Sequence, residues 1–582
     1  MTAIEYELIE ASDDLASGIG SESSIEFLED GNITVRLILL AKLVDALLSN
    51  HKQDAVIAGL PAVLEALEKL RSMEAEEFRA LISYPHTGSW LSYACRRIFD
   101  DRQDGISSVP LSADIGYLGW LVASGLIATT AEGSIELTIR HGVIMLPRIG
   151  LARLGNSGQH GQCNLYWTED GGMRFTSEWG VLQVNCPKSE DNPAWLPLRR
   201  LSGGSSESKS VYLDDIDPFR DFAEADIVEY QRNPPRLTLV EAAPWQQRFE
   251  AAWGLLEKDF ASYTIPMQRS LAMIVPLTAE YDPCSVSYTS HNGYGAVYTT
   301  APPDCCELAV TLIHEIQHTK FTLLTDQVIL HDSNQECHLY APWRQDPRPI
   351  AGLMHGIYAF FGIADFWRVH RKSPCHRSLR ADSEFERWRI QVEAAIAVAL
   401  ESGLLTPEGT RFLCTLTGSI RKWDSEEVSI EAKQDAQIVS NAHRAFWRVR
   451  NLRPASEAIA SLCDDWITKN HRTAALPDSE LIDQNGIPDN YARARIPERI
   501  PENSLTYCIA KYTESLRIDP MDPRAWAGLT LALPMKYPEL NFHVLEERTE
   551  VVAHMYETIQ LTSGDCDIVS LAQWLSSSVV HR

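Results

Sequence analysis

Apolar side chains recur every three to four residues along most of the chain, and this period predicts helices. The helical pattern covers residues 34–103, continues from Ser112 to Ser124, and resumes near Pro244 for most of the remaining chain. Between residues 133 and 183 the pattern changes to short apolar and polar alternations separated by glycines, which is typical of antiparallel strands. A further alternating segment, 285–300, predicts one strand. The expected fold class is therefore α+β and mostly α-helical, with a small antiparallel β region near 133–185 and a strand before the helix that begins near residue 304.

These changes of pattern divide the chain into four expected parts. They are an N-terminal helical region at 1–130, a β-rich region at 131–235, a helical domain at 236–400 and a C-terminal helical region at 401–582. Residues 1–30 are acidic and rich in serine, so we expect a loose lead-in there. Residues 474–503 are rich in proline and asparagine and predict a long surface connection.

The charge balance excludes several classes of function. Lys and Arg number 52 and Asp and Glu number 79, so the formal net charge is −27. A chain this acidic is poorly suited to binding a phosphate backbone, and we expect no nucleic-acid partner. No apolar run reaches the ~18 residues of a membrane span, and the acidic N-terminus lacks the pattern of a secretory signal. The 12 cysteines are scattered without a C-x-x-C pair, as expected for reduced thiols in a cytoplasmic protein.

One segment carries a recognisable chemical motif. Asp304 can cap a helix that continues through His314, Glu315 and His318, which together form an H-E-x-x-H sequence. Residues four apart lie on the same face of a helix, so two imidazoles at this spacing can converge on one metal ion. The alternative is that the two histidines are merely solvated or packed. The motif predicts a metal site.

Such a site needs a third protein ligand. His355 is our first choice, because it lies on a second apolar helix that can pack across the first; otherwise it is a core histidine. Asp326 would lie about 12 Å beyond His318 if the helix continued. His331 and Glu336, which follow the expected helix end, are further alternatives.

Two arginines stand out between these helices. Arg344 and Arg348 lie in the segment YAPWRQDPRP, residues 340–349, within a very acidic chain. Either guanidinium can hold a carboxylate with two hydrogen bonds. The alternative is that they pair with Asp346 or Asp365 and hold the loop.

Several segments of the chain resemble one bacterial family. They are ISYPHTGSWL (82–91), DIGYLGWLVASG (114–125), GVIMLPRIGLARLG (142–155), LDDIDPFR (213–220), the strand at 290–300, LAVTLIHEIQHTKF (308–321), YAPWRQDPRP (340–349) and DPRAWAGLTLAL (522–533). The family is named for its H-E-x-x-H motif and occurs beside radical-SAM peptide-modifying enzymes. Its members resemble iron(II)- and 2-oxoglutarate-dependent oxygenases that hydroxylate the β-carbon of residues in ribosomally made peptides, without the usual jelly-roll fold.

The resemblance implies that His314 and His318 would be iron ligands. In such an oxygenase the distal carboxylate of 2-oxoglutarate needs a cation, which Arg344 or Arg348 could supply. The partners would be a precursor peptide and a radical-SAM enzyme. Glu315 would orient a ligand or bind the metal itself.

Two other functions fit parts of the same pattern. In a zinc peptidase, Glu315 would be the general base acting on a zinc-bound water. A third hypothesis is a peptide-binding chaperone with a vestigial site, but the intact H-E-x-x-H motif argues against it. Neither the precursor peptide nor the modified residue follows from the sequence.

Overall fold

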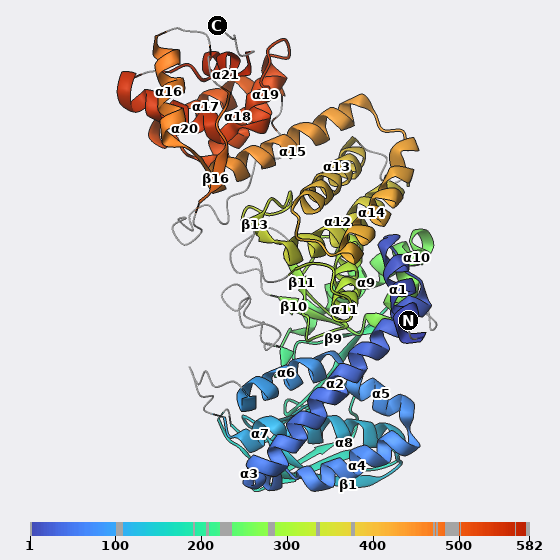
Figure 1. Ribbon diagram of the computed structural model, residues 1–582. Helices are drawn as coiled ribbons and strands as arrows, with labels where there is room; N and C mark the ends of the chain where they lie inside the picture. The colour runs from blue at the N-terminus through green and yellow to red at the C-terminus, as the bar shows by residue number, and fades with distance from the viewer. Residues whose placement is uncertain are drawn as a thin grey trace. The chain divides into compact units, whose positions relative to one another are not determined.

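The computed structural model of the protein consists of two compact units, Met1–Val328 and Ile329–Arg582, each mostly helical (Figure 1). The structure describes residues 3–99, 109–156, 158–189, 192–204, 209–220, 236–277, 286–332, 338–373, 379–468, 472, 475–482, 500, 502–564 and 566–577. The sheets in this part of the chain are small, and they form no jelly roll. The coarse expectation of a mostly helical α+β fold is confirmed.

The N-terminus differs from expectation, because the supposed loose lead-in is helical. Helix α1 spans Ala3–Ala16 and helix α2 spans Glu22–Asn50, with the Ser21 side chain accepting a hydrogen bond from the amide of Ser24. Leu15, Ile25 and Leu28 are fully buried. The acidic and serine-rich composition concealed a sparse set of apolar residues at helical spacing, and tertiary packing of those few residues stabilises the helices.

Further helices complete the N-terminal part of the first unit. They are α3 (Lys52–Ile57), α4 (Leu60–Met73), α5 (Ala75–Ser83), α6 (Pro85–Phe99), α7 (Leu111–Ile115) and α8 (Tyr117–Thr129). Helix α2 packs against α5 and α6 (Figure 1). The large aromatic side chains Trp90, Tyr117 and Trp120 are fully buried in the core that these helices share with the neighbouring strands.

The alternating segment forms two antiparallel sheets, as predicted. The first has the order β1 (Gly133–Ile139), β4 (Gly161–Trp167), β5 (Met173–Ser177) and β6 (Gly180–Val184). The second has the order β2 (Val143–Leu146), β3 (Gly150–Arg153) and β7 (Trp195–Pro197). In β4, Cys163, Leu165 and Trp167 are buried and the residues between them are exposed, which is the period of a half-buried strand.

A mixed five-stranded sheet lies closer to the H-E-x-x-H segment. Its order is β11 (Ser287–Thr289), β12 (Ala296–Thr300), β10 (Met273–Leu277), β9 (Ser210–Leu213) and β8 (Arg199–Ser202). Strand β10 is parallel to β9 and β12, whereas β11 and β8 pair antiparallel with their neighbours. The single strand expected at 285–300 is therefore a hairpin. Gly295 permits its turn, with φ of +93° and no room for a Cβ beside the carbonyl oxygen of Ser270.

Helices α9 (Leu239–Asp259), α10 (Ala261–Ser270) and α11 (Cys305–Thr325) complete the first unit. The side chains of Thr238 and Glu241 form a capping box at the start of α9. Helix α11 packs against α9, α2 and β11.

The second unit is a set of helices with two short two-stranded sheets. Its helices are α12 (Ile350–His370), α13 (Leu379–Glu401), α14 (Pro407–Arg421), α15 (Ile430–Asn451), α16 (Ser456–Ile467), α17 (Leu505–Ile518), α18 (Pro523–Lys536), α19 (His543–Glu547), α20 (Thr549–Ser563) and α21 (Ile568–Ser576). Its strands are β13 (His338–Leu339), β14 (Arg348–Pro349), β15 (Leu452–Pro454) and β16 (Ser479–Leu481). Strand β16 is a described part of the segment expected as a surface connection; residues 483–499 lie outside the described residues.

The boundary between the units falls inside the segment 236–400 that the sequence suggested as one domain. Helix α11 packs within the first unit, whereas α12 packs mainly against α13 in the second. The chain passes from the first unit to the second after Val328, and the helical pattern of the sequence does not indicate this boundary.

Two apolar stretches, Leu111–Thr129 and Ile350–His370, are long enough to cross a membrane by length and composition alone. The protein buries 78% of the first window and 67% of the second. Burial of this extent is typical of core helices.

A close approach of main chains sets the position of α6. A Cβ on Gly88 would lie 2.0 Å from the carbonyl oxygen of Asn292 and 2.9 Å from a guanidinium nitrogen of Arg36. Arg36 is buried and donates to the carbonyl oxygens of Ile82, Tyr84 and Asn292. The first turn of α6 is thus fixed to α2 and to the β11–β12 turn.

We predict that Gly88→Ala destabilises the protein by about 1–3 kcal/mol, because main-chain atoms must shift to admit the methyl group. Gly254→Ala is the matched control, since Gly254 lies in α9 with open space around its Cβ position. It should stabilise by about 0.5–1 kcal/mol. Chemical denaturation of both variants measures the difference, and equal effects would contradict the close approach.

Candidate metal centres

The helix that carries H-E-x-x-H begins as the sequence predicts. The Asp304 side chain accepts hydrogen bonds from the amides of Cys306 and Glu307, each 2.9 Å long. Leu308, Leu312 and Ile316 are buried along one side of α11. The cap and the apolar side together place the start of the helix and its rotation about its axis, and hence the direction of the histidines.

His314 and His318 lie on consecutive turns of α11 with their rings side by side. The ring centroids are 4.7 Å apart and the ring planes are nearly perpendicular, at 89°. Both side chains are half-buried. Burial, and then the neighbouring His314, hold the pKa of His318 well below its usual value. Neutral imidazoles at this spacing are suited to binding one metal ion.

Glu315 is directed into the protein and makes its contacts with strand β11. Its side chain is fully buried, and its Oε1 accepts a 2.6 Å hydrogen bond from the Ser287 hydroxyl. Burial raises the pKa of Glu315 to about 7, against the opposing effect of the Ser287 and Thr289 hydroxyls. The carboxyl group therefore anchors α11 to the edge of the five-stranded sheet.

A second pair of polar contacts holds α11 to the turn between α1 and α2. Gln317 Nε2 donates to the carbonyl oxygen of Gly18 at 2.8 Å, and Lys320 Nζ donates to that of Ile19 at 2.6 Å. Burial lowers the pKa of Lys320 to about 7, although Asp14 opposes the shift. The N-terminal helices thus support the motif.

The candidates for a third ligand lie in different places. Asp326 follows α11 as its C-cap residue, and its Oδ1 lies 2.7 Å from Nε2 of His291. His355 is half-buried on α12, and His331 forms a β-bridge with Leu405; both histidines belong to the second unit. Glu336 lies outside the described residues. The first choice, His355, therefore remains a prediction.

Both arginines of the 340–349 segment pair with the same carboxylate. Arg344 Nε lies 2.9 Å from Oδ1 of Asp346, and Arg348 Nη1 lies 3.3 Å from Oδ2. Burial raises the pKa of Asp346, but the two arginines outweigh it and hold this pKa below its usual value. Asp365, the other expected partner, pairs instead with Arg368. A bound 2-oxoglutarate would have to share or displace Asp346.

The second unit also contains a cavity that the sequence did not suggest. Its volume is 120 Å³, and its lining residues are Tyr340, Pro342, Ile390, Gln391, Ala394, Gln437, Ser440 and Arg444. Gln391 is buried, and its Oε1 has no hydrogen-bond partner among the described residues. Arg444 is a further cation near the YAPWRQDPRP segment that can bind a small carboxylate.

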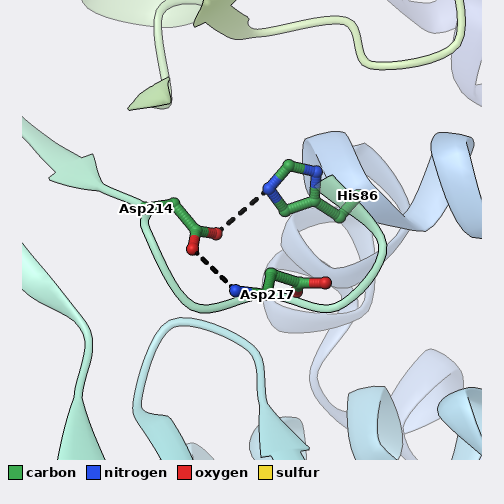
Figure 2. Close-up of side chains that lie close together, drawn as sticks. All are labelled: His86, Asp214 and Asp217. Carbon is green, nitrogen blue, oxygen red and sulfur yellow. Dashed lines mark hydrogen bonds and ion pairs between the residues drawn. The ribbon is translucent and has the colours of Figure 1, made fainter. Parts of the chain in front are cut away.

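A separate cluster of potential metal ligands lies elsewhere in the first unit. His86 on α6 and the carboxylates of Asp214 and Asp217, in the loop after β9, are fully buried (Figure 2). Their ligand atoms all lie within 4.8 Å of one another, and His86 Nε2 is 3.0 Å from Oδ2 of Asp214.

The pKa values of the two carboxyl groups, Asp214 and Asp217, shift in opposite directions. Burial raises the pKa of Asp217 to about 6, with His86 opposing and Asp214 adding to the shift. For Asp214, burial raises the pKa, but the hydrogen bond and charge of His86, together with the main-chain amides of Asp217 and Ile216, outweigh it and bring the pKa to about 2. One carboxylate is held ionised and its neighbour is close to accepting a proton.

Sequence reasoning found the segments of this cluster but not its chemistry. His86 lies in ISYPHTGSWL and the two aspartates lie in LDDIDPFR, which are separated by more than a hundred residues. The D-D-x-D spacing was the available signal, yet nothing in the sequence brings a histidine beside it.

No family model matches this chain, and no curated protein matches it.

Proposed function

We propose that the protein is a cytoplasmic non-haem iron(II)- and 2-oxoglutarate-dependent oxygenase that hydroxylates a side-chain β-carbon in a ribosomally made peptide. The observation that supports the proposal most directly is that the histidines and the glutamate of the motif differ in their burial. His314 and His318 are half-buried and their rings lie side by side, whereas Glu315 is fully buried and contacts β11. A peptidase needs this glutamate beside a metal-bound water. The buried contact with Ser287 counts against that role.

The residues fit an iron ion. Imidazoles are common iron ligands, and the facial arrangement of non-haem oxygenases uses few protein ligands so that positions stay open. His314, His318 and, as the predicted third ligand, His355 would hold the metal. When bound, iron with 2-oxoglutarate and O₂ supplies the oxidising power for hydroxylation, and 2-oxoglutarate leaves as succinate and CO₂.

The chain itself contributes orientation. The Glu315–Ser287 hydrogen bond fixes the rotation of α11, and this fixes the direction of both imidazoles. A guanidinium, from Arg344 or Arg348, binds the distal carboxylate of the co-substrate. Each residue has one role in this arrangement: three proposed metal ligands, one anchor and one residue that binds the carboxylate.

The position of β11 supports the proposal that the substrate is a peptide. This strand is at the end of the strand order in its sheet and lies beside α11. An edge strand can accept an extended peptide through main-chain hydrogen bonds. The resemblance to the H-E-x-x-H family adds a precursor peptide and a radical-SAM enzyme as partners.

The first prediction concerns the metal at His314 and His318. His314→Ala and His318→Ala should each abolish iron binding at α11, because each removes a proposed ligand. His355→Ala should weaken iron binding by at least the roughly 10–100-fold typical of losing a supporting residue. Anaerobic iron(II) titration measures the affinity. His543→Ala, which changes an exposed histidine, is the control and should bind normally. Unchanged iron affinity in both α11 variants would refute the site.

The second prediction concerns the co-substrate. Arg344→Ala or Arg348→Ala should lose about 1.5–3 kcal/mol of 2-oxoglutarate binding, roughly a 10- to 150-fold higher requirement, with iron binding retained. We expect the smaller effect for Arg344, whose side chain is 51% exposed. Arg444→Ala is the comparison. If it alone raises the requirement, the cavity of the second unit holds the carboxylate.

The third prediction separates an oxygenase from a zinc peptidase. Incubation with iron(II), 2-oxoglutarate, O₂ and the precursor peptide should give an unbroken peptide heavier by one oxygen atom. Glu315→Gln should retain measurable hydroxylation, because the amide preserves the shape of an anchoring side chain. In a peptidase, the same change should abolish turnover with zinc still bound. Mass spectrometry decides; a peptide cleaved without 2-oxoglutarate would identify the zinc enzyme.

A further inference from the structure

The cluster of His86, Asp214 and Asp217 has no role in the proposed oxygenase. It joins two segments that are distant in sequence, the first turn of α6 and the loop after β9 (Figure 2). All three side chains have no measurable exposure. Three buried ionisable groups at one point in the core need a source of neutralising charge.

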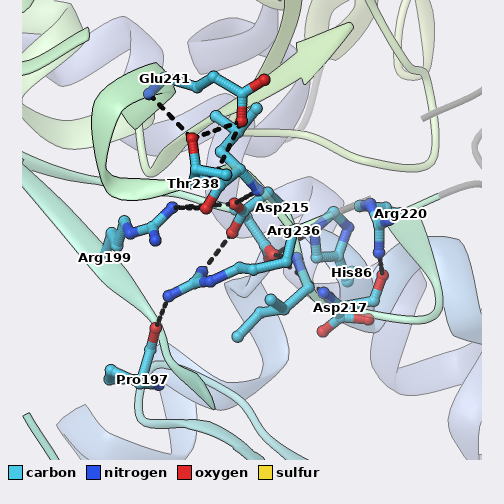
Figure 3. A network of polar contacts seen from close by, with 12 residues as sticks. His86, Pro197, Arg199, Asp215, Asp217, Arg220, Arg236, Thr238 and Glu241 are labelled. Atoms are coloured by element: carbon cyan, nitrogen blue, oxygen red, sulfur yellow. Dashed lines mark hydrogen bonds and ion pairs between the residues drawn. The ribbon is translucent and has the colours of Figure 1, made fainter. Parts of the chain in front are cut away.

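The nearby arginines act on the cluster without forming an ion pair with its carboxylates: Arg140 interacts electrostatically with Asp217, and Arg220 with His86. Arg199 and Arg236 pair with Asp215, on the other side of the loop (Figure 3). Arg220 donates to the main-chain oxygen of Asp217 at 2.7 Å. No arginine or lysine in the described part of the chain forms an ion pair with Asp214 or Asp217. A protonated His86 balances one carboxylate and leaves the second.

The hydrogen bonds around the cluster resemble the support of a metal site. Oδ1 of Asp214 accepts from the amides of Ile216 and Asp217, both at 3.0 Å. Oδ1 of Asp217 accepts from the amide of Phe219 at 2.8 Å. These bonds fix both carboxylates, while Oδ2 of Asp214 faces the imidazole. Ligating carboxylates in metalloproteins are held in the same way.

Two phenols extend this support. Tyr117 donates to Oδ2 of Asp217 at 2.9 Å, and Tyr84 donates to Oδ2 of Asp214 at 3.3 Å. The 3.0 Å between His86 Nε2 and Asp214 Oδ2 is close to the separation of two ligands that share an ion at about 2.0–2.2 Å. A small cation can therefore bind without a large rearrangement.

We propose that His86, Asp214 and Asp217 bind a divalent transition-metal ion that ties α6 to the loop after β9. One imidazole and two carboxylates suit Zn²⁺, Mn²⁺ or Fe²⁺ better than Mg²⁺ or Ca²⁺, which prefer oxygen ligands. Complete burial assigns this ion a structural role. The inference is independent of the oxygenase proposal, because no residue is shared with α11.

The test uses His314→Ala/His318→Ala as the background, so that metal at α11 does not contribute. After incubation with Zn²⁺ or Mn²⁺ and gel filtration, we expect about one metal ion per chain, bound in the first unit. Adding Asp217→Asn should remove it, whereas adding Asp215→Asn should not, since Asp215 pairs with arginines instead. Metal analysis measures the stoichiometry.

A second measurement covers the case in which the Asp217 variant does not fold. The double variant with an intact cluster should melt several degrees lower after chelation and recover when Zn²⁺ or Mn²⁺ is restored. Absence of bound metal in this background, together with a melting temperature that chelation does not change, would overturn the proposal. The cluster would then be a proton-sharing ion pair.

Discussion

The position of α11 between a sheet edge and the N-terminal turn is the constraint on which the first unit depends. A helix with two histidines on one face must present its other faces to the protein, and here those faces carry polar groups. Glu315 bonds to Ser287 on β11, and Gln317 and Lys320 bond to main-chain oxygens of the α1–α2 turn. Each of these three side chains has at least one specific partner, and a different rotation of the helix would break these contacts together. The half-buried histidines are a consequence of that rotation.

The sequence predicted local features of this arrangement better than the distant ones. The Asp304 cap, the histidine spacing and the antiparallel strands depend on neighbours within a few residues, and these predictions are confirmed by the structure. The N-terminal helices were missed because composition outweighed a weak apolar period. The hairpin of β11 and β12 was read as one strand because alternation continues through its turn. Periodicity alone does not reveal which helix packs on which, so His355 remains a prediction.

Charge pairing distinguishes the second cluster from Asp114 and Asp215, two other buried acids of this unit. Asp114 bonds to Arg97 and Arg140, and Asp215 bonds to Arg199 and Arg236. In a chain with a net charge of −27, each such carboxylate needs a dedicated cation to be buried at acceptable cost. Among the described residues, Asp214 has only His86 as an ion-pair partner, and Asp217 has none. Their environment, like that of Glu315, departs from this pattern, and a bound ion or a retained proton is expected there.

The α11 histidines and the His86 cluster differ in burial, and this difference suits the two candidate centres to different roles. A reaction on a peptide requires ligands that a substrate can approach, and only the half-buried histidines of α11 meet this condition. The cluster at His86 is closed to solvent, so an ion there can change stability but cannot meet a peptide. The close approach of Gly88 to Asn292 and the cluster at His86 fix the same turn of α6. The same approach fixes the hairpin whose strand β11 holds Glu315. A structural ion at His86 would thus act on the α11 site only through the rigidity of this shared frame.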